Sequence, residues 1–240
     1  DGIVERGAPT MANRGDGIVE RGAPTMANRG AGILGQMLRF GVHRAIVESS
    51  PVQLLYRPGG KGRPRERVLA DDEIGAVLAN LERAMRFKTT ATGRTPRMAH
   101  VLRILLLTGQ RRGELGLARW SDVTLTGNEP AWQIPPEHSK TGAAHTVPLS
   151  PAAVREFKAL HEYAGTSRYV LPTDDGRDPA DPRIITRALA RNLPRLRALA
   201  AEADPPVTLA DFTVHDLRRT CRTGLAKLNV AAEIGERILN

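Results

Sequence analysis

Residues 105–120 read LLLTGQRRGELGLARW. The apolar run before Thr108 predicts a buried helix, and the Thr108-Gly109 pair predicts its end, because glycine permits a tight turn or a close backbone approach. Arg111 follows directly after the break, so a short, rigid element would hold its guanidinium in place. Glu114 lies three positions further on and can orient Arg111. A plain helix-loop-helix corner with surface arginines is the alternative interpretation.

A second cationic cluster occurs in TVHDLRRT, residues 213–220. Thr213 and Asp216 have the spacing of a helix capping box, so His215 and Arg218 would share one face near the start of a helix. Backbone N–H groups at a helix start favour an anion, and an arginine beside a histidine suits a phosphate group. An ordinary solvated helix face is the alternative. The apolar residues expected to face the core are Leu217, Cys221, Leu225 and Leu228.

Lys140 lies in HSKTGAAHTVPLS, residues 138–150, between two segments with the period of β-strands. The KTGAA stretch is typical of a turn, which places Lys140 near the tip of a hairpin. A lysine there can reach a leaving oxygen and donate a proton to it. An exposed turn lysine without a function is the alternative.

The remaining pattern predicts a mainly helical protein with a small antiparallel sheet, an α+β fold. The segments with strand-like alternation are 122–127, 131–136 and 145–150. A capping side chain, often followed by proline, suits the first turn of a helix. Such helix starts occur at Asp71, Thr95-Pro96, Ser150-Pro151 and Asp181-Pro182.

The charge of the chain points to a polyanionic partner. Its 240 residues contain 35 Lys and Arg against 26 Asp and Glu, a net charge of +9, and the pI is about 10.5. This balance favours nucleic acid, with a merely soluble basic protein as the alternative. The single cysteine, Cys221, excludes an intrachain disulfide, and no Cys/His spacing resembles a zinc site. No apolar run has the length of a membrane span, so we expect a cytoplasmic, DNA-associated protein and no membrane partner.

A row of arginines provides a separate candidate for DNA contacts. The arginines that recur at every fourth position are Arg183, Arg187 and Arg191. This spacing places them along one side of a helix, where they could follow a DNA backbone. Arg195 continues the spacing, but Pro194 interrupts the helical pattern beside it. A solubilising face is an equally good interpretation.

Read together, the three stretches resemble the tyrosine recombinases, the phage integrase family. TGQRRGEL is similar to the first conserved box of the family, T-G-x-R-x-x-E-L, and HDLRRT is similar to the second, H-x-L-R-R-T. SKTGAAHTVPL is similar to the β-hairpin that carries the catalytic lysine of the family. The resemblance covers about residues 28–240 and implies the fold of the family's catalytic domain, with site-specific DNA integration as the activity.

The resemblance implies a role for each residue of these stretches. Arg111 and Arg218 would bind the non-bridging oxygens of the scissile phosphate, and Lys140 would protonate the departing 5′ oxygen. His215 would hydrogen-bond the phosphate or take the proton of the nucleophile, with Glu114 as a supporting residue. Two fixed guanidiniums neutralise the charge, so neither a metal nor another cofactor is expected. The partner would be double-stranded DNA, bound by a tetramer on two sites.

A domain order is also implied by the resemblance. Residues 28–55 would form the last helix of a core-binding domain, residues 56–70 a basic linker and residues 71–240 the catalytic domain. Arg63 and Arg65 in the linker could contact the DNA backbone, with a solvated charge run as the alternative.

Residues 1–15, DGIVERGAPTMANRG, recur without change as residues 16–30. A structural repeat would diverge and would need several copies to bury a core, so an identical pair indicates a recent duplication or an assembly artefact. We expect the start of this duplication to be disordered and assign it no function.

In the tyrosine recombinases a tyrosine attacks phosphorus and leaves a 3′-phosphotyrosyl DNA with a free 5′ hydroxyl. None of the three tyrosines, Tyr56, Tyr163 and Tyr169, matches the position of this nucleophile, which we expect beyond Asn240. We therefore expect these 240 residues to bind DNA without cleaving it. A decayed recombinase that occupies DNA without cutting it is the second hypothesis. A helix-turn-helix regulator is the third, but it does not account for Lys140 in a hairpin between two arginine boxes.

Overall fold

The computed structural model describes residues 22–49, 59–60, 65–85, 87–89, 93–95 and 97–239. These residues belong to two units, residues 1–65 and residues 66–240, and each is described by itself. The first copy of the 15-residue duplication and Arg63 of the expected linker lie outside the described residues.

The described part of the first unit includes a long helix, α2 (Pro24–His43), which starts with proline where no backbone N–H is needed. Asn28 connects this helix to the segment ahead of the second unit. Its side chain donates to the Gly60 carbonyl and accepts from the Gly59 N–H, both at 2.9 Å. A helix is therefore present where the sequence predicts one, although it starts and ends earlier than expected, and its assignment to a core-binding domain stays a prediction.

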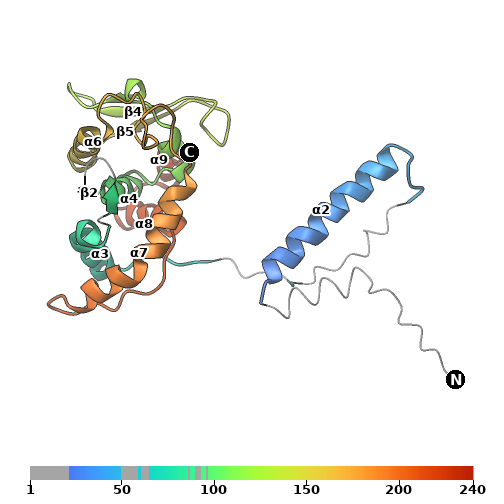
Figure 1. Cartoon of the computed structure of the whole chain (residues 1–240), viewed down its shortest axis with the longest axis horizontal. Coiled ribbons are helices and arrows are strands. Elements are labelled where there is room, and N and C mark those ends of the chain that lie inside the picture. Colours follow the sequence, from blue (N-terminus) through green and yellow to red (C-terminus); the bar gives the residue numbers. More distant parts are fainter. Residues whose placement is uncertain are drawn as a thin grey trace. The chain divides into compact units, whose positions relative to one another are not determined.

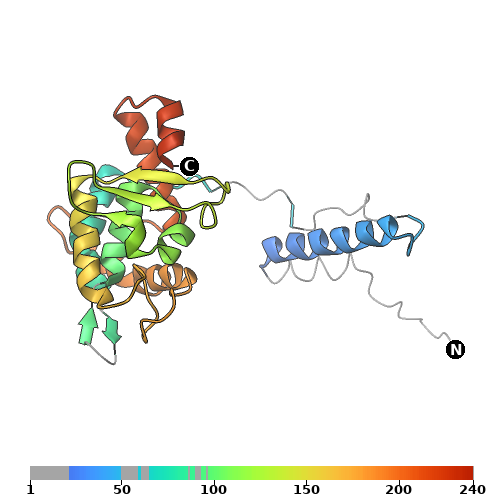
Figure 2. The ribbon, with the colours of Figure 1, turned by 90° about the horizontal axis from the view of Figure 1, so that it is seen from above.

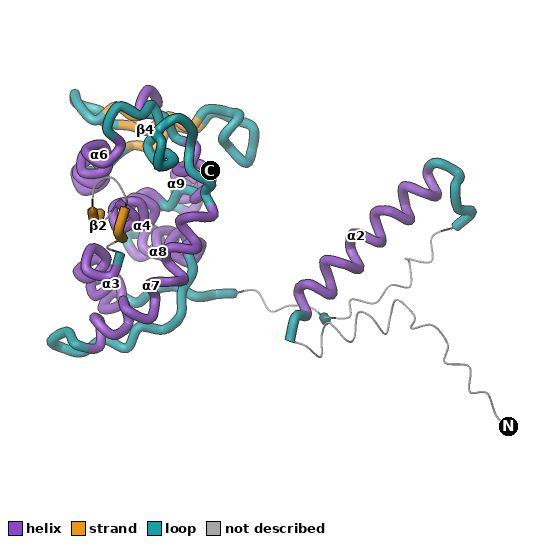
Figure 3. Tube along the Cα trace, in the orientation of Figure 1, coloured by secondary structure: helices purple, strands orange, loops and turns teal. Residues whose placement is uncertain are grey.

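The second unit contains most of the described helices and the two described sheets (Figures 1 and 3). Its elements are α3 (Asp71–Ala84), β1 (Phe87–Thr89), β2 (Gly93–Thr95), α4 (Arg97–Thr108), α5 (Arg112–Leu117), the 3₁₀ helix η2 (Trp120–Asp122), β3 (Val123–Thr124), β4 (Ala131–Ile134), β5 (His145–Pro148), α6 (Pro151–Ala164), α7 (Arg183–Ala201), α8 (Val214–Lys227) and α9 (Ala232–Leu239). This order confirms the predicted fold class, mainly helical with a small antiparallel sheet.

The centre of this unit is α4, which lies between α6 on one side and α3, α7 and α8 on the other (Figure 1). Nine of its twelve residues are buried, as expected for a helix that is apolar on nearly all sides. Its position explains why the sequence before Thr108 is so uniformly hydrophobic. None of the described helices combines the length and hydropathy that a bilayer crossing demands.

The three-stranded sheet has the order β3-β4-β5 and is antiparallel throughout. Trp132 and Ile134 are buried while Gln133 between them is exposed, so the alternation of β4 directs one face to the core. On that face Trp132 packs edge-on against Phe157 of α6, with ring centroids 6.0 Å apart. Ser150, the N-cap of α6, accepts from the Ala153 N–H at 3.2 Å, which confirms the predicted start of this helix.

Two details of the predicted elements are wrong. Asp71 is not an N-cap: Ala70 occupies that position, and its N–H donates to Glu73 Oε2 at 2.9 Å, so the capping partner is supplied from within the first turn. Leu228 does not face the core, because α8 ends at Lys227 and the Leu228 side chain lies in the following turn, 76% exposed. Asn229 has a φ of +57°, a conformation that stops α8 and starts the turn toward α9.

The β1–β2 hairpin is not predicted by the sequence. It pairs Phe87 with Thr95 in antiparallel register and stands at an edge of the second unit, apart from the three-stranded sheet (Figure 2). Strands of three residues are too short for a period-two pattern to identify them.

The segment that leads into α3 is held by buried polar contacts. Glu73, 6% exposed, accepts from the Arg67 guanidinium and from the Ala210 N–H at 3.2 Å. The Leu69 N–H donates to Thr220 Oγ1 of α8 at 3.0 Å. Burial raises the pKa of Glu73, but the hydrogen bonds from Arg67 and the backbone outweigh it and lower the pKa below its usual value.

Acid should therefore destabilise the second unit through Glu73. Because its pKa is lowered only in the folded protein, the unfolded chain binds the proton first as the pH falls. The stability that Glu73 contributes is complete above the ordinary glutamate pKa of about 4.3 and is lost as the pH drops through the lower folded value. Thermal unfolding should be followed between about pH 7 and pH 3. The melting temperature should fall less in Glu73→Gln than in the original chain, because glutamine cannot titrate. An equal loss in the variant would contradict this assignment.

Candidate functional site

The turn after α4 requires a glycine. Gly109 has a φ of +65°, and a Cβ added there would lie 2.3 Å from Leu239 Cδ2 and 3.0 Å from Cys221 Sγ. Thr108, the last residue of α4, donates its hydroxyl to the Ile104 carbonyl at 2.7 Å. The close backbone approach predicted for Gly109 is therefore present, and the two neighbours that demand it belong to α9 and α8.

Arg111 is the N-cap residue of α5 and is oriented by Glu114. One carboxylate oxygen of Glu114 accepts from the Arg111 backbone N–H at 2.7 Å, and the other accepts from Arg111 Nη1 at 2.9 Å. The Glu114 side chain is 2% exposed, against 28% for Arg111. A buried carboxylate thus holds both the backbone and the guanidinium of Arg111, as the spacing of three predicts.

Arg218 approaches the same turn from α8. Its Nη1 donates to the Gly109 carbonyl at 2.8 Å. The start of α8 is fixed by Asp216, which is fully buried and accepts from the Thr213 N–H and hydroxyl, both at 2.8 Å. Burial and the neighbouring charge of Arg111 lower the pKa of the Arg218 guanidinium. The two arginines therefore repel one another, and an anion between them would relieve this repulsion.

His215 lies one turn before Arg218 on α8. Partial desolvation, followed by the charges of Arg219, Arg218 and Arg111, lowers the pKa of its imidazole below the usual value. The ring is therefore predominantly neutral at pH 7 and has a nitrogen that can accept a proton.

A pocket of about 720 Å³ joins these groups. Arg111, Glu114, Lys140, His215 and Arg218 all line it, so the structure brings together the five site residues predicted from three distant stretches of sequence. Lys140 reaches it from the exposed loop between β4 and β5. A volume of this size is in the range of ordinary ligand sites and exceeds what a single phosphate group fills.

The expected DNA-contacting arginines of α7, which are Arg183, Arg187 and Arg191, do not line this pocket. Arg183 and Arg187 on α7 are 80% and 70% exposed, and both lie within 4 Å of Asp181, at 3.9 and 3.7 Å. Arg191 is exposed on the same helix, and Arg65 is the last residue of the first unit. Arg63 lies outside the described residues.

Further pocket residues were not predicted from the sequence. They are Gln110, Arg112, Gly113, His138, Ser139, Thr186, Thr213 and Val214. Arg112 donates to the Thr186 hydroxyl of α7, a contact across 74 positions, so α7 borders the pocket through Thr186. The second arginine in the QRRG stretch was a usable signal for Arg112, whereas nothing local in the sequence marks Thr186.

The remaining groups to consider in this region are metal-ligating side chains and the thiol of Cys221. Among the described residues, no group of three His, Cys, Asp or Glu side chains is arranged to hold a metal ion. Cys221 is half-buried, and burial raises the pKa of its thiol, which the charge of Arg218 only partly offsets. Cys221 therefore packs behind Gly109 as a neutral side chain.

Comparison with known proteins identifies the family of this chain. A profile of the phage integrase family matches residues 67–239. This chain belongs to the phage integrase family. Prophage integrase IntZ of Escherichia coli K12 is 30% identical over 159 residues, which are 66% of this chain and 37% of IntZ. Prophage integrase IntA of the same organism is 30% identical over 87 residues, 36% of this chain and 21% of IntA, so the match spans well under half of either relative.

Solved structures of integrases share the fold. A lambda integrase dimer bound to a COC′ core site matches with a TM-score of 0.69 and 17% identity, over 97% of this chain and 80% of that one. A lambda integrase tetramer bound to a Holliday junction matches with a TM-score of 0.67 and 18% identity, over 95% of this chain and 62% of that one. The Tn1549 transposon integrase in complex with circular intermediate DNA matches with a TM-score of 0.64 and 12% identity, over 95% of this chain and 75% of that one. At these identities the likeness concerns the fold, and it confirms the fold expected for a phage integrase catalytic domain.

Gly109→Ala should destabilise this integrase chain more than Gly142→Ala. The two glycines have φ of +65° and +72°, so each alanine meets a similar backbone strain. A Cβ at Gly142 meets nothing within 4 Å, whereas one at Gly109 collides with Leu239 and Cys221. Unfolding by denaturant should show that the free energy of unfolding falls by about 1 kcal/mol in Gly142→Ala and by about 2–4 kcal/mol in Gly109→Ala. Equal losses would show that the Gly109 turn has room for a side chain.

Proposed function

We propose that this chain supplies the DNA-binding and phosphate-activating part of a site-specific recombinase that integrates or excises a mobile element. The observation that carries the proposal is the pocket in which Arg111, Lys140, His215 and Arg218 meet. The reaction class is transesterification through a phosphotyrosyl intermediate, without a metal ion. Such a reaction exchanges one phosphodiester for another and needs no nucleotide cofactor.

Arg111 and Arg218 are proposed to bind the two non-bridging oxygens of the scissile phosphate. Their guanidiniums are planar, permanently charged and held by Glu114 and by the Gly109 carbonyl, so little reorganisation is needed when the phosphate arrives. In phosphoryl transfer an arginine that stabilises the transition state contributes roughly 10³–10⁵ in rate. Glu114 acts on the phosphate only through Arg111.

Lys140 and His215 are proposed to handle the two protons. His215 is predominantly neutral at pH 7, so it can accept the proton of an attacking hydroxyl while the new bond to phosphorus forms. Lys140, a cation on an exposed loop, donates its proton to the 5′ oxygen as the old bond to phosphorus breaks. The attack of the free 5′ hydroxyl in the second step reverses both transfers.

The attacking tyrosine is proposed to be none of the three in this sequence. Tyr163 stacks on His100 with ring centroids 5.8 Å apart, and Tyr169 is 6% exposed with its hydroxyl accepting from Arg168 at 2.7 Å. Neither lines the pocket. Tyr56 lies outside the described residues.

Double-stranded DNA is the proposed partner. The net charge of +9 favours it, and so do the exposed arginines Arg183, Arg187 and Arg191 on the helix that borders the pocket through Thr186. The similar lambda integrase structures contain a dimer on a core site and a tetramer on a Holliday junction. By analogy, the whole protein is proposed to act as a tetramer that joins two DNA sites.

A DNA-binding remnant without cleavage activity is the second candidate. This candidate is favoured because neither Tyr163 nor Tyr169 lines the pocket, while the pocket residues can still bind a phosphate. A helix-turn-helix regulator has less support, because it gives no reason for Lys140 to share a pocket with both arginines.

Arg111→Gln and Arg218→Gln should each weaken the binding of duplex DNA. Each removes one phosphate contact, so the slope of log K against log salt concentration should fall in magnitude by about 0.9. Lys158→Ala on α6 is the matched control, since Lys158 is exposed and outside the pocket but carries the same charge. Fluorescence anisotropy titrations at several salt concentrations measure the slope. If both arginine variants match the control, the pocket does not bind phosphate.

These 240 residues should form no covalent adduct with DNA. A nicked duplex that traps a 3′-phosphotyrosyl bond, followed by denaturing electrophoresis and mass spectrometry, tests for it directly. Binding without an adduct is expected, because the pocket holds neither Tyr163 nor Tyr169. An adduct that disappears in Tyr56→Phe, Tyr163→Phe or Tyr169→Phe would identify a nucleophile within the chain and overturn this part of the proposal.

A further inference from the structure

The end of α9 is bound by two side chains, one from the pocket wall and one from the strand that follows the loop of Lys140. Gln110 Nε2 donates to the Ile238 carbonyl at 2.7 Å, across 128 positions, and His145 Nε2 lies 3.1 Å from the same oxygen. Carbonyls in the last turn of a helix lack an intrahelical donor, so this oxygen can accept from both. Gln110 directly precedes Arg111, and His145 begins the strand after the loop of Lys140. One carbonyl thus connects the two elements that carry these pocket cations.

The contact between α9 and the turn after α4 leaves no spare volume. Leu239 is 2% exposed and lies so close to Gly109 that no Cβ fits between them. The carbonyl of Gly109 also accepts from Arg218. The pair Gly109 and Gln110 therefore supports α9 on one side and Arg218 on the other. Because protein interiors are close-packed, a shift of this turn displaces both.

Stability alone does not explain a glutamine at position 110. Its side chain donates to the Thr108 carbonyl at 3.0 Å as well as to Ile238, so both hydrogens of the amide are used. Its Oε1 is buried, and in the part of the chain that the structure describes it has no hydrogen-bond partner. A buried amide oxygen without a donor has lost its hydrogen bonds to water without replacement, a cost that an apolar side chain of the same length would avoid. A polar group kept at that cost, in the wall of the pocket, indicates a role for its N–H groups.

We propose that Gln110 is a positioning residue that couples the docking of α9 to the binding of a DNA phosphate. This inference rests on the proposed function of the pocket. A phosphate between Arg111 and Arg218 fixes the turn from the pocket side, and the Ile238 carbonyl fixes it from the side of α9. Each event lowers the cost of the other, so docked α9 favours DNA binding by the same factor by which DNA favours docking.

Hydrogen–deuterium exchange of the 240-residue chain, with and without a duplex DNA, measures this coupling. No described residue of α9 lines the pocket, so a phosphate group bound in the pocket does not contact this helix directly. We expect DNA to slow the exchange of the α9 amides by at least about fivefold, the lower end of typical coupling between sites. Unchanged α9 exchange at saturating DNA would overturn the proposal.

Gln110→Met keeps the length of the side chain and removes its N–H groups. In this variant DNA should no longer slow exchange in α9, and the Kd for DNA should rise by the same factor, about fivefold or more. His145→Phe removes the other donor to Ile238. It should also reduce the effect of DNA on α9 exchange and raise the Kd for DNA, so the proposal can be tested even if Gln110→Met does not fold. Retained coupling in the folded variants would contradict the proposal.

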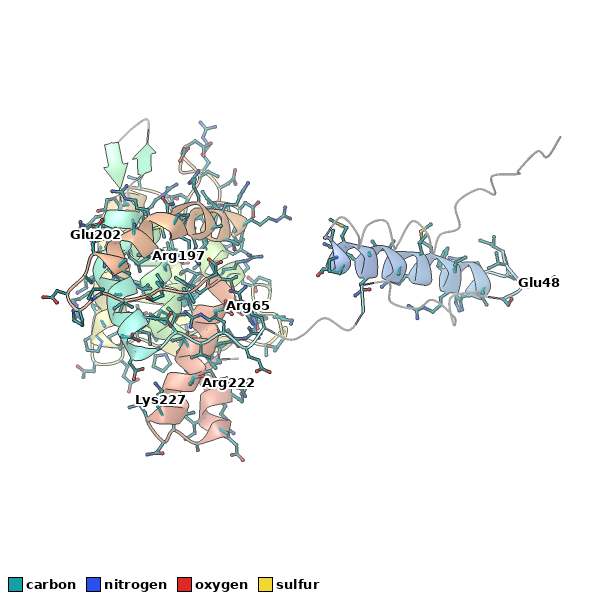
Figure 4. All side chains as sticks on the ribbon, turned by 90° about the horizontal axis from the view of Figure 1, so that it is seen from below. Glu48, Arg65, Arg197, Glu202, Arg222 and Lys227 are labelled. Carbon is teal, nitrogen blue, oxygen red and sulfur yellow. The ribbon has the colours of Figure 1, made fainter. Side chains whose placement is uncertain are left out.

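Arg222→Ala is the matched control. Arg222 on α8, labelled in Figure 4, forms an exposed ion pair with Glu236 of α9 at 2.5 Å, and neither residue lines the pocket. Its loss should speed α9 exchange to the same extent with and without DNA and leave the Kd unchanged. A loss of coupling in this variant as well would show that any loosening of α9 suffices and that Gln110 has no particular role.

The Arg218→Gln variant separates failure of this inference from failure of the proposed function. If Arg218→Gln binds DNA normally, the pocket is not a phosphate site and the proposed function fails. If Arg218→Gln weakens binding while Gln110→Met changes neither the affinity nor the α9 response, only the coupling is wrong.

Discussion

The closeness of two guanidiniums is the constraint on which the rest of this site depends. Arg111 and Arg218 come from α5 and α8, and burial together with the charge of Arg111 disfavours the cation at Arg218. A fold can hold two such charges only if it supplies fixed acceptors for them. Glu114 does this for Arg111 and the Gly109 carbonyl does it for Arg218. The capped turn and the buried helix before it are the means by which those acceptors are held.

The turn between α4 and α5 therefore serves several elements at once. α4 is buried on nearly all sides and provides a rigid base, and Gly109 lets α8 and α9 approach its end. The Gly109 carbonyl is directed to Arg218, while the next residue, Gln110, reaches Ile238. A side chain at position 109 would separate α9 from this turn and shift the acceptor of Arg218 in the same step. The glycine is thus required by packing as well as by backbone conformation.

The parts of the site that could be predicted from the sequence are those fixed by local spacing. Glu114 lies one turn from Arg111, and Thr213 and Asp216 form a capping box, so these contacts follow from positions three apart. That Lys140 joins the arginines came from the resemblance to a family and not from the residues themselves.

Other features depend on which surfaces meet, which no local pattern encodes. Arg112 meets Thr186 across 74 positions and Gln110 meets Ile238 across 128. Leu228 continued the apolar spacing of α8, yet the chain turns at Asn229 and leaves that leucine in solvent. Asn229 was a usable signal for the turn, because asparagine tolerates a positive φ better than most residues. The apolar spacing through Leu228 predicted instead that the helix continues.

The roles proposed for the pocket cations are of two kinds. Charge stabilisation works best with groups that are already in place, and both arginines are held by acceptors that belong to folded elements. Proton donation requires a group that can reach an oxygen as its bond breaks, which suits Lys140 on an exposed loop. That loop is not independent of the rest, because His145 at its end contacts the same Ile238 carbonyl as Gln110. The segment that carries Lys140 and the turn before Arg111 thus share an attachment point on α9, the Ile238 carbonyl.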